Sequence, residues 1–192
     1  MSTVVVVRKN GEAVIAADTL TKWGASKESA AYVVNHEKIN RVGENYLGLT
    51  GHASGNLMLE DYFAKMRREV RLDTPLRIFQ TWVEMHSVLK EKYHLRAEDD
   101  DDDAVESSRL SALIVNPSGI FGVDSDRTVE EYTRFYAYGS GGDFAMGAMY
   151  ATYDDPSRSA ADIARLAVEA AADFDDATGL PITLYTVALR AG

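Results

Sequence analysis

The start of the chain alternates short apolar runs with turn residues, a pattern typical of antiparallel strands. Residues 3–18 predict two strands around Asn10-Gly11, because this dipeptide favours the positive φ angles of a tight hairpin turn. A second pair of strands is predicted at 38–42 and 46–50. We therefore expect the chain to open with two β-hairpins.

Beyond the second hairpin, the apolar positions recur at helical spacing. A first helix is predicted with Ser54 as its N-cap, and its apolar positions are Leu59, Tyr62, Phe63, Met66 and Val70. Thr74-Pro75 begins a second helix, since proline suits the first helical position. The apolar face of this second helix is predicted to consist of Leu76, Phe79 and Val83.

The second half of the chain repeats this order of strands and then helices. Strands are predicted at 110–115, 120–123 and 135–138, and a helix follows to about residue 150. Ser159 and Asp162 have the spacing of a capping box for another helix, whose apolar positions are Ile163, Leu166, Ala167, Ala170 and Phe174. A last strand is predicted at 181–189. We expect one domain spanning 1–192, in which two antiparallel sheets pack together and helices cover both outer faces.

Composition excludes several classes of function. The 192 residues carry a formal net charge of -10, which argues against binding to nucleic acids or anionic membranes. The chain has no cysteine, so neither a disulfide nor a thiolate metal site is expected. No apolar run is long enough for a signal peptide or a membrane span, and a cytoplasmic location is expected.

Ser2 is the first candidate for chemistry. Methionine aminopeptidase acts when the second side chain is small, so Met1 is expected to be removed and Ser2 to become the N-terminus. Ser2 would then carry both a hydroxyl and a free α-amine, whose ordinary pKa of about 7.7 to 8.0 lets it act as a base at neutral pH. Thr3 is a rival nucleophile if processing removes one more residue.

Five stretches of the sequence together resemble the proteasome β-subunit family. They are Ser2 at the processed terminus, "AVIAADTLT", "NHEKINRV", "GLTGHASG" and "YGSGG", and the resemblance covers nearly the whole chain. The start looks closest to HslV-type peptidases, whereas the long acidic middle loop is similar to the betaproteobacterial proteasome homologue. The resemblance implies the N-terminal nucleophile hydrolase fold, a four-layer αββα sandwich, assembled into stacked rings of six or seven identical subunits.

The resemblance also assigns catalytic roles. Ser2 matches the nucleophile, although the family usually has threonine there, so we expect a working but slower amide hydrolase. Lys38 matches the lysine beside the nucleophile, and Asp18 matches the aspartate that orients and pairs with that lysine. Gly51 matches the glycine whose N–H forms the oxyanion hole.

The residues expected to flank the nucleophile's amine are Ser140, Asp175 and Thr178, with Asp173 and Asp176 as alternatives to Asp175 in register. The family's primary specificity pocket matches Thr21, His36, Leu49 and Ala53, which suggests a preference for an apolar side chain of moderate size. A Ser–His pair using His52 lacks any other triad signature. No spacing of ligands indicates a metal, and no cofactor is expected.

The loop at 95–108 contains six adjacent carboxylates, Glu98 to Asp103. Locally, such a run predicts a solvated, flexible loop. In the ring implied by the resemblance, the same loop approaches the axial pore, where symmetry would make it an acidic collar that attracts basic, unfolded segments. The hypothesis predicts that neutralising the loop changes the selection between basic and acidic peptides.

The leading interpretation is a self-compartmentalising peptidase that takes unfolded peptides or proteins as substrates. One alternative is an amidohydrolase of the same fold that acts on a small molecule. Another is a catalytically silent ring that binds peptides, which requires that Met1 be retained and the nitrogen of Ser2 remain an amide. The family resemblance leaves an ATP-dependent unfoldase open as a partner, but no C-terminal docking tail for one is evident in the sequence.

Overall fold

The computed structural model describes residues 2–66, 69–96 and 104–190. The first predicted hairpin forms the centre of one sheet, as β1 (Thr3–Lys9) and β2 (Glu12–Asp18). Asn10 and Gly11 turn the chain with φ values of 52° and 80°, as the dipeptide predicts. The sheet has the order β10-β1-β2-β11, with β10 at Phe135–Gly139 and β11 at Ile182–Ala188. All its strand pairs are antiparallel.

The second sheet has the order β5-β6-β7-β8-β9 and is also antiparallel throughout. Its strands are β5 (Ile39–Val42), β6 (Asn45–Gly51), β7 (Leu110–Asn116), β8 (Gly119–Val123) and β9 (Val129–Tyr132). The sheets face each other through aliphatic side chains, among them Val4, Val6 and Ile15 of the first sheet and Leu113, Val115 and Ile120 of the second. Burial on both faces explains why β1 begins with an uninterrupted apolar run.

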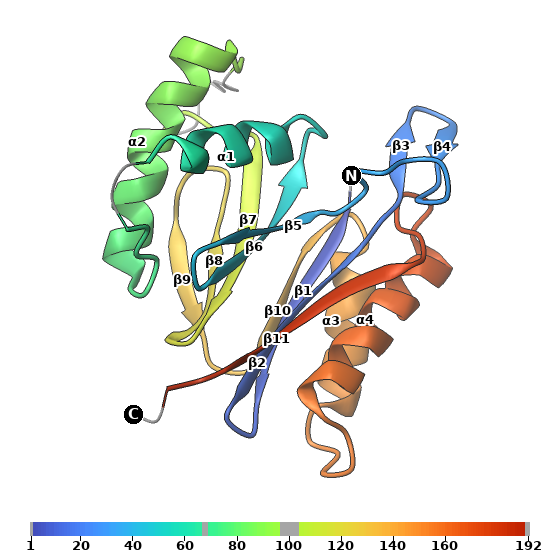
Figure 1. Cartoon of the computed structure of the whole chain (residues 1–192). Helices are drawn as coiled ribbons and strands as arrows, with labels where there is room; N and C mark the ends of the chain where they lie inside the picture. Colours follow the sequence, from blue (N-terminus) through green and yellow to red (C-terminus); the bar gives the residue numbers. More distant parts are fainter. Residues whose placement is uncertain (1, 67–68, 97–103, 191–192) are drawn as a thin grey trace.

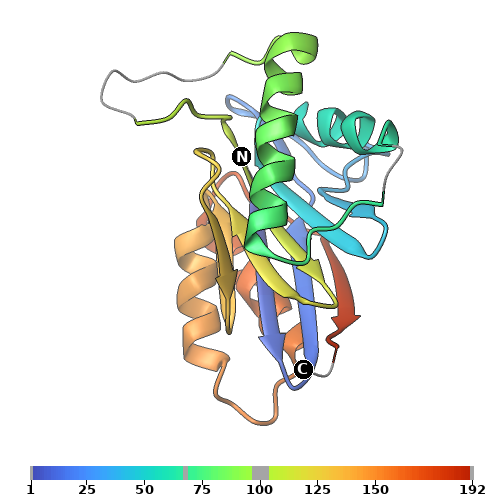
Figure 2. The same ribbon diagram turned by 90° about the vertical axis from the view of Figure 1, so that its left-hand side faces the viewer.

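Helices cover both outer faces of this pair of sheets (Figures 1 and 2). α1 (Gly55–Ala64) and α2 (Pro75–Tyr93) pack on the five-stranded sheet. α3 (Gly142–Thr152) and α4 (Ala160–Phe174) pack on the four-stranded sheet, where small alanine side chains allow close contact. The predicted four-layer αββα sandwich is therefore confirmed.

Two further strand features were not predicted. A small hairpin, β3 (Thr21–Trp23) and β4 (Ser26–Glu28), follows the first sheet's central strands. Its residues are mostly exposed, so they lack the apolar alternation that marks a half-buried strand. β9 is an edge strand with a polar sequence, and its pairing depends on β8 alone. Both elements were missed because their strand character comes from backbone pairing and not from burial.

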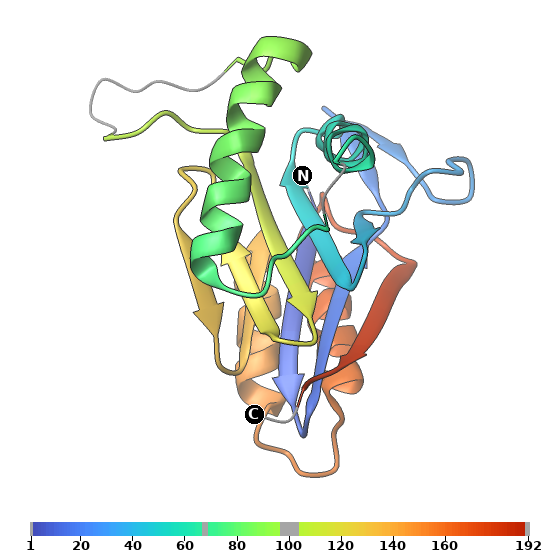
Figure 3. The same cartoon turned by 60° about the vertical axis from the view of Figure 1, so that its left-hand side comes forward.

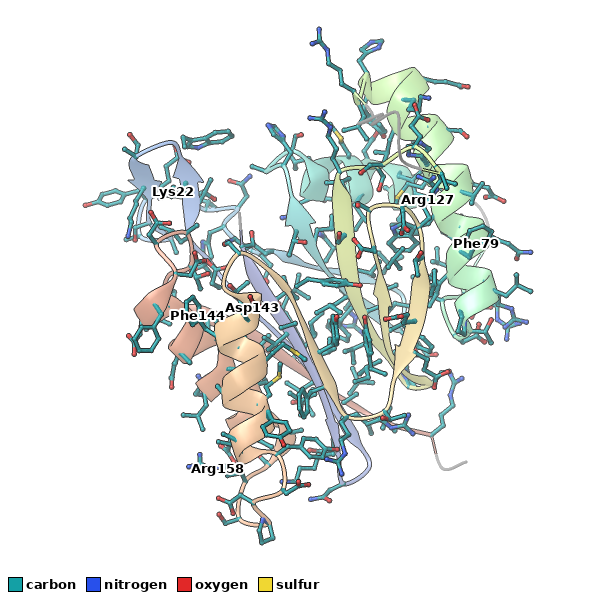
Figure 4. The ribbon with its side chains drawn as sticks, turned by 180° about the vertical axis from the view of Figure 1, so that it is seen from behind. Lys22, Phe79, Arg127, Asp143, Phe144 and Arg158 are labelled. Carbon is teal, nitrogen blue, oxygen red and sulfur yellow. The ribbon has the colours of Figure 1, made fainter. Side chains whose placement is uncertain are left out.

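The predicted buried face of α2 is wrong. Its inward residues are Ile78, Trp82, Met85 and Leu89, whereas Leu76 is 65% exposed and Phe79 and Val83 are also exposed. Phe79 lies on the outer side of the helix (Figure 4). The start of α2 is as predicted, because Thr74 accepts a hydrogen bond from the Arg77 N–H and Pro75 is the first helical residue.

The other helices differ from the predictions at their ends. α1 ends at Ala64, so Met66 and Val70 contact the core from beyond the helix, and the Ser54 side chain makes no cap. In α4 the capping box of Ser159 and Asp162 is present, but Phe174 is 73% exposed and contacts the Phe144 ring.

The acidic run, Glu98 to Asp103, lies entirely outside the described residues, and the structure describes only the flanks of the 95–108 loop. The collar hypothesis therefore stays a prediction. Glu106, which follows them, pairs with Lys90 and His86 of α2. Within the part of the chain that the structure describes, no helix is long and apolar enough to cross a membrane.

Candidate active site

A cleft of about 540 Å³ opens beside Ser2. It lies at the end of the sandwich where β1 begins, between α1 and the β3–β4 hairpin, and the last strand, β11, ends at the opposite end (Figures 1 and 3). Seven predicted site residues line it: Ser2, Thr21, His36, Lys38, Leu49, Gly51 and Ala53. Another cavity, of about 410 Å³ beside Asn116 and Arg190, contains none of the predicted residues.

Asp18 and Lys38 form a buried ion pair beside this cleft. Lys38 Nζ donates to Asp18 Oδ1 at 2.8 Å and to the Leu20 carbonyl at 2.6 Å. Asp18 Oδ1 also accepts the Thr3 N–H at 2.9 Å, while Oδ2 accepts the N–H groups of Leu20 and Gly179 at 3.0 and 3.1 Å. Asp18 is completely buried and Lys38 is 6% exposed. Through the Thr3 N–H, this pair is bonded to the residue that follows Ser2 in the chain.

Burial lowers the pKa of the Lys38 ammonium from its ordinary value, because desolvation disfavours the charged form. The charge and hydrogen bond of Asp18 oppose this effect, and the charge of Asp175 opposes it more weakly. Lys38 is therefore a buried cation that is paired with Asp18 at the wall of the cleft.

Asp175 accepts hydrogen bonds from two of the hydroxyls that were predicted to lie near the amine of the nucleophile. Its Oδ2 accepts Ser140 Oγ at 2.7 Å and Thr178 Oγ1 at 2.6 Å. Burial raises the pKa of the Asp175 carboxyl, but the hydrogen bonds from Thr178 and Ser140 outweigh it, so the pKa lies below its ordinary value. The alternative Asp176 instead pairs with Lys22 of the β3–β4 hairpin, which Figure 4 labels.

Two glycines adjoin the site with backbone conformations that other residues rarely adopt. Gly51 has φ +126°, and a Cβ there would lie 2.5 Å from the Arg109 carbonyl oxygen. Gly139 has φ +106°, and a Cβ there would lie 1.7 Å from the Ser2 carbonyl oxygen. The next residue, Ser140, donates its N–H to that same oxygen at 3.1 Å. Glycine at 139 is therefore needed for the backbone to approach Ser2 this closely.

Several residues of this region make contacts that were not predicted from the sequence. The backbone of Leu20 binds both members of the ion pair, and the buried Thr3 contacts both Asp18 and Thr178. Trp23 lies at the cleft, with its ring 6.2 Å from that of His52. His52 Nδ1 bonds Ser54 Oγ at 2.7 Å, which ties this histidine to the start of α1. Trp23 was not predicted to line the cleft, because the hairpin that carries it was not predicted.

The arrangement fits nucleophilic chemistry. A serine hydroxyl, a buried ammonium and a strand end with accessible backbone meet at one cleft. Among the described residues, no cluster of histidine, aspartate and glutamate could hold a metal ion.

The family model for the proteasome subunit matches residues 1–187. The chain belongs to the proteasome subunit family. A structure of the betaproteobacterial proteasome homologue (BPH) from Thiobacillus denitrificans is 53% identical, covering 99% of this chain and 100% of that chain with a TM-score of 0.95. A second structure, of the same organism's BPH in complex with epoxomicin, is 52% identical, covering 98% and 100% with a TM-score of 0.94. No curated protein matches this chain.

Eukaryotic HslV from Trypanosoma brucei is a more distant match. Its structure is 21% identical with a TM-score of 0.70, covering 97% of this chain and 99% of that chain. At that identity the likeness concerns the fold alone. The resemblance seen in the sequence is therefore confirmed for the family and for BPH, with HslV further away.

Proposed function

We propose that this chain is the subunit of a self-compartmentalising peptidase that cleaves unfolded peptides or proteins with Ser2. The proposal includes a single peptidase domain over 1–192, a cytoplasmic location and a homo-oligomeric double ring with six or seven subunits per ring. Membership of the proteasome subunit family supports it, as does the solved complex of T. denitrificans BPH with epoxomicin. Epoxomicin is a peptide epoxyketone, and compounds of this class form a stable ring with a hydroxyl and a free α-amine on one residue.

The observation that carries the proposal is the position of Ser2. It lines the cleft together with Lys38 and Gly51, and its carbonyl is held by the Ser140 N–H. Removal of Met1 would expose the Ser2 nitrogen at this point as a free amine. The hydroxyl, its base and a cationic neighbour would then share one small volume.

In the proposed mechanism, Ser2 Oγ attacks the substrate carbonyl while its proton passes to the α-amine. The Lys38 ammonium favours loss of the hydroxyl proton and keeps the amine uncharged beforehand, because like charges repel. The N–H of Gly51 is proposed to bind the oxyanion. When the C–N bond breaks, the leaving amine takes the proton and an ester to Ser2 remains. Water, deprotonated by the α-amine, then attacks the ester carbonyl. The bond between the acyl carbon and Ser2 Oγ breaks, the peptide leaves as a carboxylic acid, and Oγ takes the proton back from the α-amine.

Serine in place of threonine changes the rate and not the reaction. Threonine's methyl restricts rotation about χ1 and so helps to aim the hydroxyl, whereas serine samples more rotamers. We therefore expect Ser2 to react more slowly than a threonine in the same place.

The wall of the cleft that selects the substrate side chain is proposed to consist of Thr21, His36, Leu49 and Ala53. Leu49 is buried within this wall, which favours an apolar substrate side chain of moderate size. An extended peptide would bind by pairing its backbone along the cleft, and this tolerates many sequences.

The test is intact-protein mass spectrometry before and after incubation of the assembled protein with epoxomicin. The expected result is a species without Met1 that gains one inhibitor mass per subunit, with the adduct mapped to Ser2. Ser2→Ala should form no adduct, because it lacks the hydroxyl, and Ser2→Thr should react at least as fast as the native protein. The threonine variant is the matched control, since it keeps the hydroxyl and the amine.

A native protein that retains Met1, or that is processed and yet unreactive, would overturn the nucleophile assignment and favour a silent, peptide-binding ring. An adduct together with cleavage of small amides but not of unfolded casein would favour the amidohydrolase. Native mass spectrometry of the same sample counts the subunits per ring.

A further inference from the structure

Thr3, the residue after the proposed nucleophile, is completely buried and bonded through two different groups. Its N–H donates to Asp18 Oδ1 at 2.9 Å, and its Oγ1 lies 2.6 Å from Thr178 Oγ1. Thr178 in turn donates to Asp175 Oδ2. Thr3 therefore contacts both carboxylate systems of the site.

The direction of these hydrogen bonds follows from counting protons. An ionised carboxylate only accepts, so the single hydroxyl proton of Thr178 goes to Asp175. The proton shared between the two threonines must then belong to Thr3. The order is fixed: Thr3 donates to Thr178, and Thr178 donates to Asp175, which also accepts Ser140.

The fold provides the space for this contact. At Gly141 a Cβ would lie 2.5 Å from Thr3 Oγ1 and 3.0 Å from Thr178 Oγ1. A side chain at that position would force the two hydroxyls to move. Gly141 thus allows the hydroxyls of Thr3 and Thr178 to approach each other beneath the start of α3.

The peptide group between Ser2 and Thr3 is held from both sides. The Ser140 N–H donates to its carbonyl at 3.1 Å, and its own N–H donates to Asp18. The Thr3 hydroxyl, on the side chain that follows this peptide group, adds a third anchor. These anchors leave rotation about χ1 as the main freedom of the Ser2 hydroxyl.

We propose that Thr3 is a positioning residue: its hydroxyl fixes Thr178 against Asp175 and holds the backbone from which Ser2 reacts. The inference rests on the proposed role of Ser2. Thr3 acts through Thr178 and through the Ser2–Thr3 peptide, without touching the reacting atoms.

The experiment compares Thr3→Val, which keeps the branched shape but loses the hydroxyl, with Thr3→Ser, which keeps the hydroxyl. The assembled proteins are incubated with a series of epoxomicin concentrations, well below the temperature at which either variant unfolds. Loss of one hydrogen bond to a buried hydroxyl corresponds to a fall of about 5- to 20-fold in the limiting rate of adduct formation in Thr3→Val. The half-saturating concentration should not change, and Thr3→Ser should stay within about 2-fold of the native rate.

A double variant sharpens the test. If Thr3 acts through Thr178, Thr3→Val added to Thr178→Val should slow adduct formation little beyond Thr178→Val alone, because coupled residues are not additive. If Thr3→Val does not assemble, Thr3→Ser and Thr3→Ala give the same comparison with smaller side chains.

A native limiting rate in Thr3→Val, or fully additive losses in the double variant, would overturn the inference while Ser2 remains the nucleophile. Absence of any adduct in the native protein would instead overturn the proposed function, so the two failures are distinguishable.

Discussion

Two carboxylates flank the start of β1, and they are held in different ways. Asp18 is completely buried and accepts three backbone N–H groups and the Lys38 ammonium. Asp175 is half-buried and accepts two side-chain hydroxyls, those of Ser140 and Thr178. Three of the four donors to Asp18 are backbone N–H groups, whereas the hydroxyls of Ser140 and Thr178 that donate to Asp175 are on side chains that can rotate.

This difference indicates different roles. The donors to Asp18 come from β1, from the residue pair after β2 and from the segment after α4, so its position depends on the whole fold. A change there should affect folding and activity together. Asp175 belongs to a local network at the end of α4, and a change there should affect activity more than stability.

The largest expected effect is that of Asp18→Asn. An asparagine leaves the buried Lys38 cation without a counter-charge and presents an NH₂ group to donors, so unfolding should become easier by about 3 to 5 kcal/mol. Adduct formation with epoxomicin should fall below detection. Urea denaturation followed by circular dichroism measures the stability.

Asp61→Asn is the matched control for this variant. Asp61 pairs with Lys65 and Lys92 on the surface, where solvent screens the charges, so its loss should matter far less. Equal losses from the two asparagine variants would contradict the framework role of Asp18. Adding Lys38→Met to Asp18→Asn should recover part of the stability, since no unpaired cation would then remain.

The next effect is that of Gly139→Ala. A Cβ at this position meets the Ser2 carbonyl at 1.7 Å, and φ +106° is unfavourable for alanine, so the backbone that holds Ser2 must move. We expect a loss of about 1 to 3 kcal/mol in stability and a fall of about 100-fold in the rate of adduct formation.

Gly147→Ala is its control, because a Cβ within α3 at that position meets no atom within 4 Å. This variant should gain about 0.5 to 1 kcal/mol, because alanine favours the helix more than glycine does, with activity unchanged. A Gly139→Ala protein as reactive as Gly147→Ala would show that Ser2 tolerates a shifted backbone.

The position of Asp18 beside the start of β1 could be predicted from the sequence. The Asn10-Gly11 turn pairs Lys9 with Glu12 and therefore Val4 with Ala17, which puts Asp18 beside the first residues of β1. The contact with Lys38 required, in addition, the family resemblance, because β5 belongs to the other sheet.

The Asp175 side was harder to predict. Three aspartates fall within 173–176, and the choice among them depends on where α4 ends, which is at Phe174 with Asp175 as C-cap. A shift of one residue would turn another carboxylate towards Ser140. The buried face of α2 was mispredicted for a related reason, since that helix carries apolar residues on two sides and only packing selects Ile78 and Trp82 over Leu76 and Phe79.

The smallest expected effect on stability is that of Asp175→Asn. Asparagine keeps an acceptor oxygen for Ser140 or Thr178, so the protein should fold normally, while adduct formation slows by about 10-fold through loss of the charged acceptor.

The pKa of Asp175 is lowered in the folded state from its ordinary value of 3.8, so its stabilising effect is present above that pH. That effect is lost as the pH falls through the lower folded-state pKa. The difference in melting temperature between the native protein and Asp175→Asn should therefore be present at pH 6 and shrink as the pH falls below 3.8. A difference that persists unchanged at low pH would mean that asparagine disturbs packing, and that the charge of Asp175 does not set the behaviour of this network.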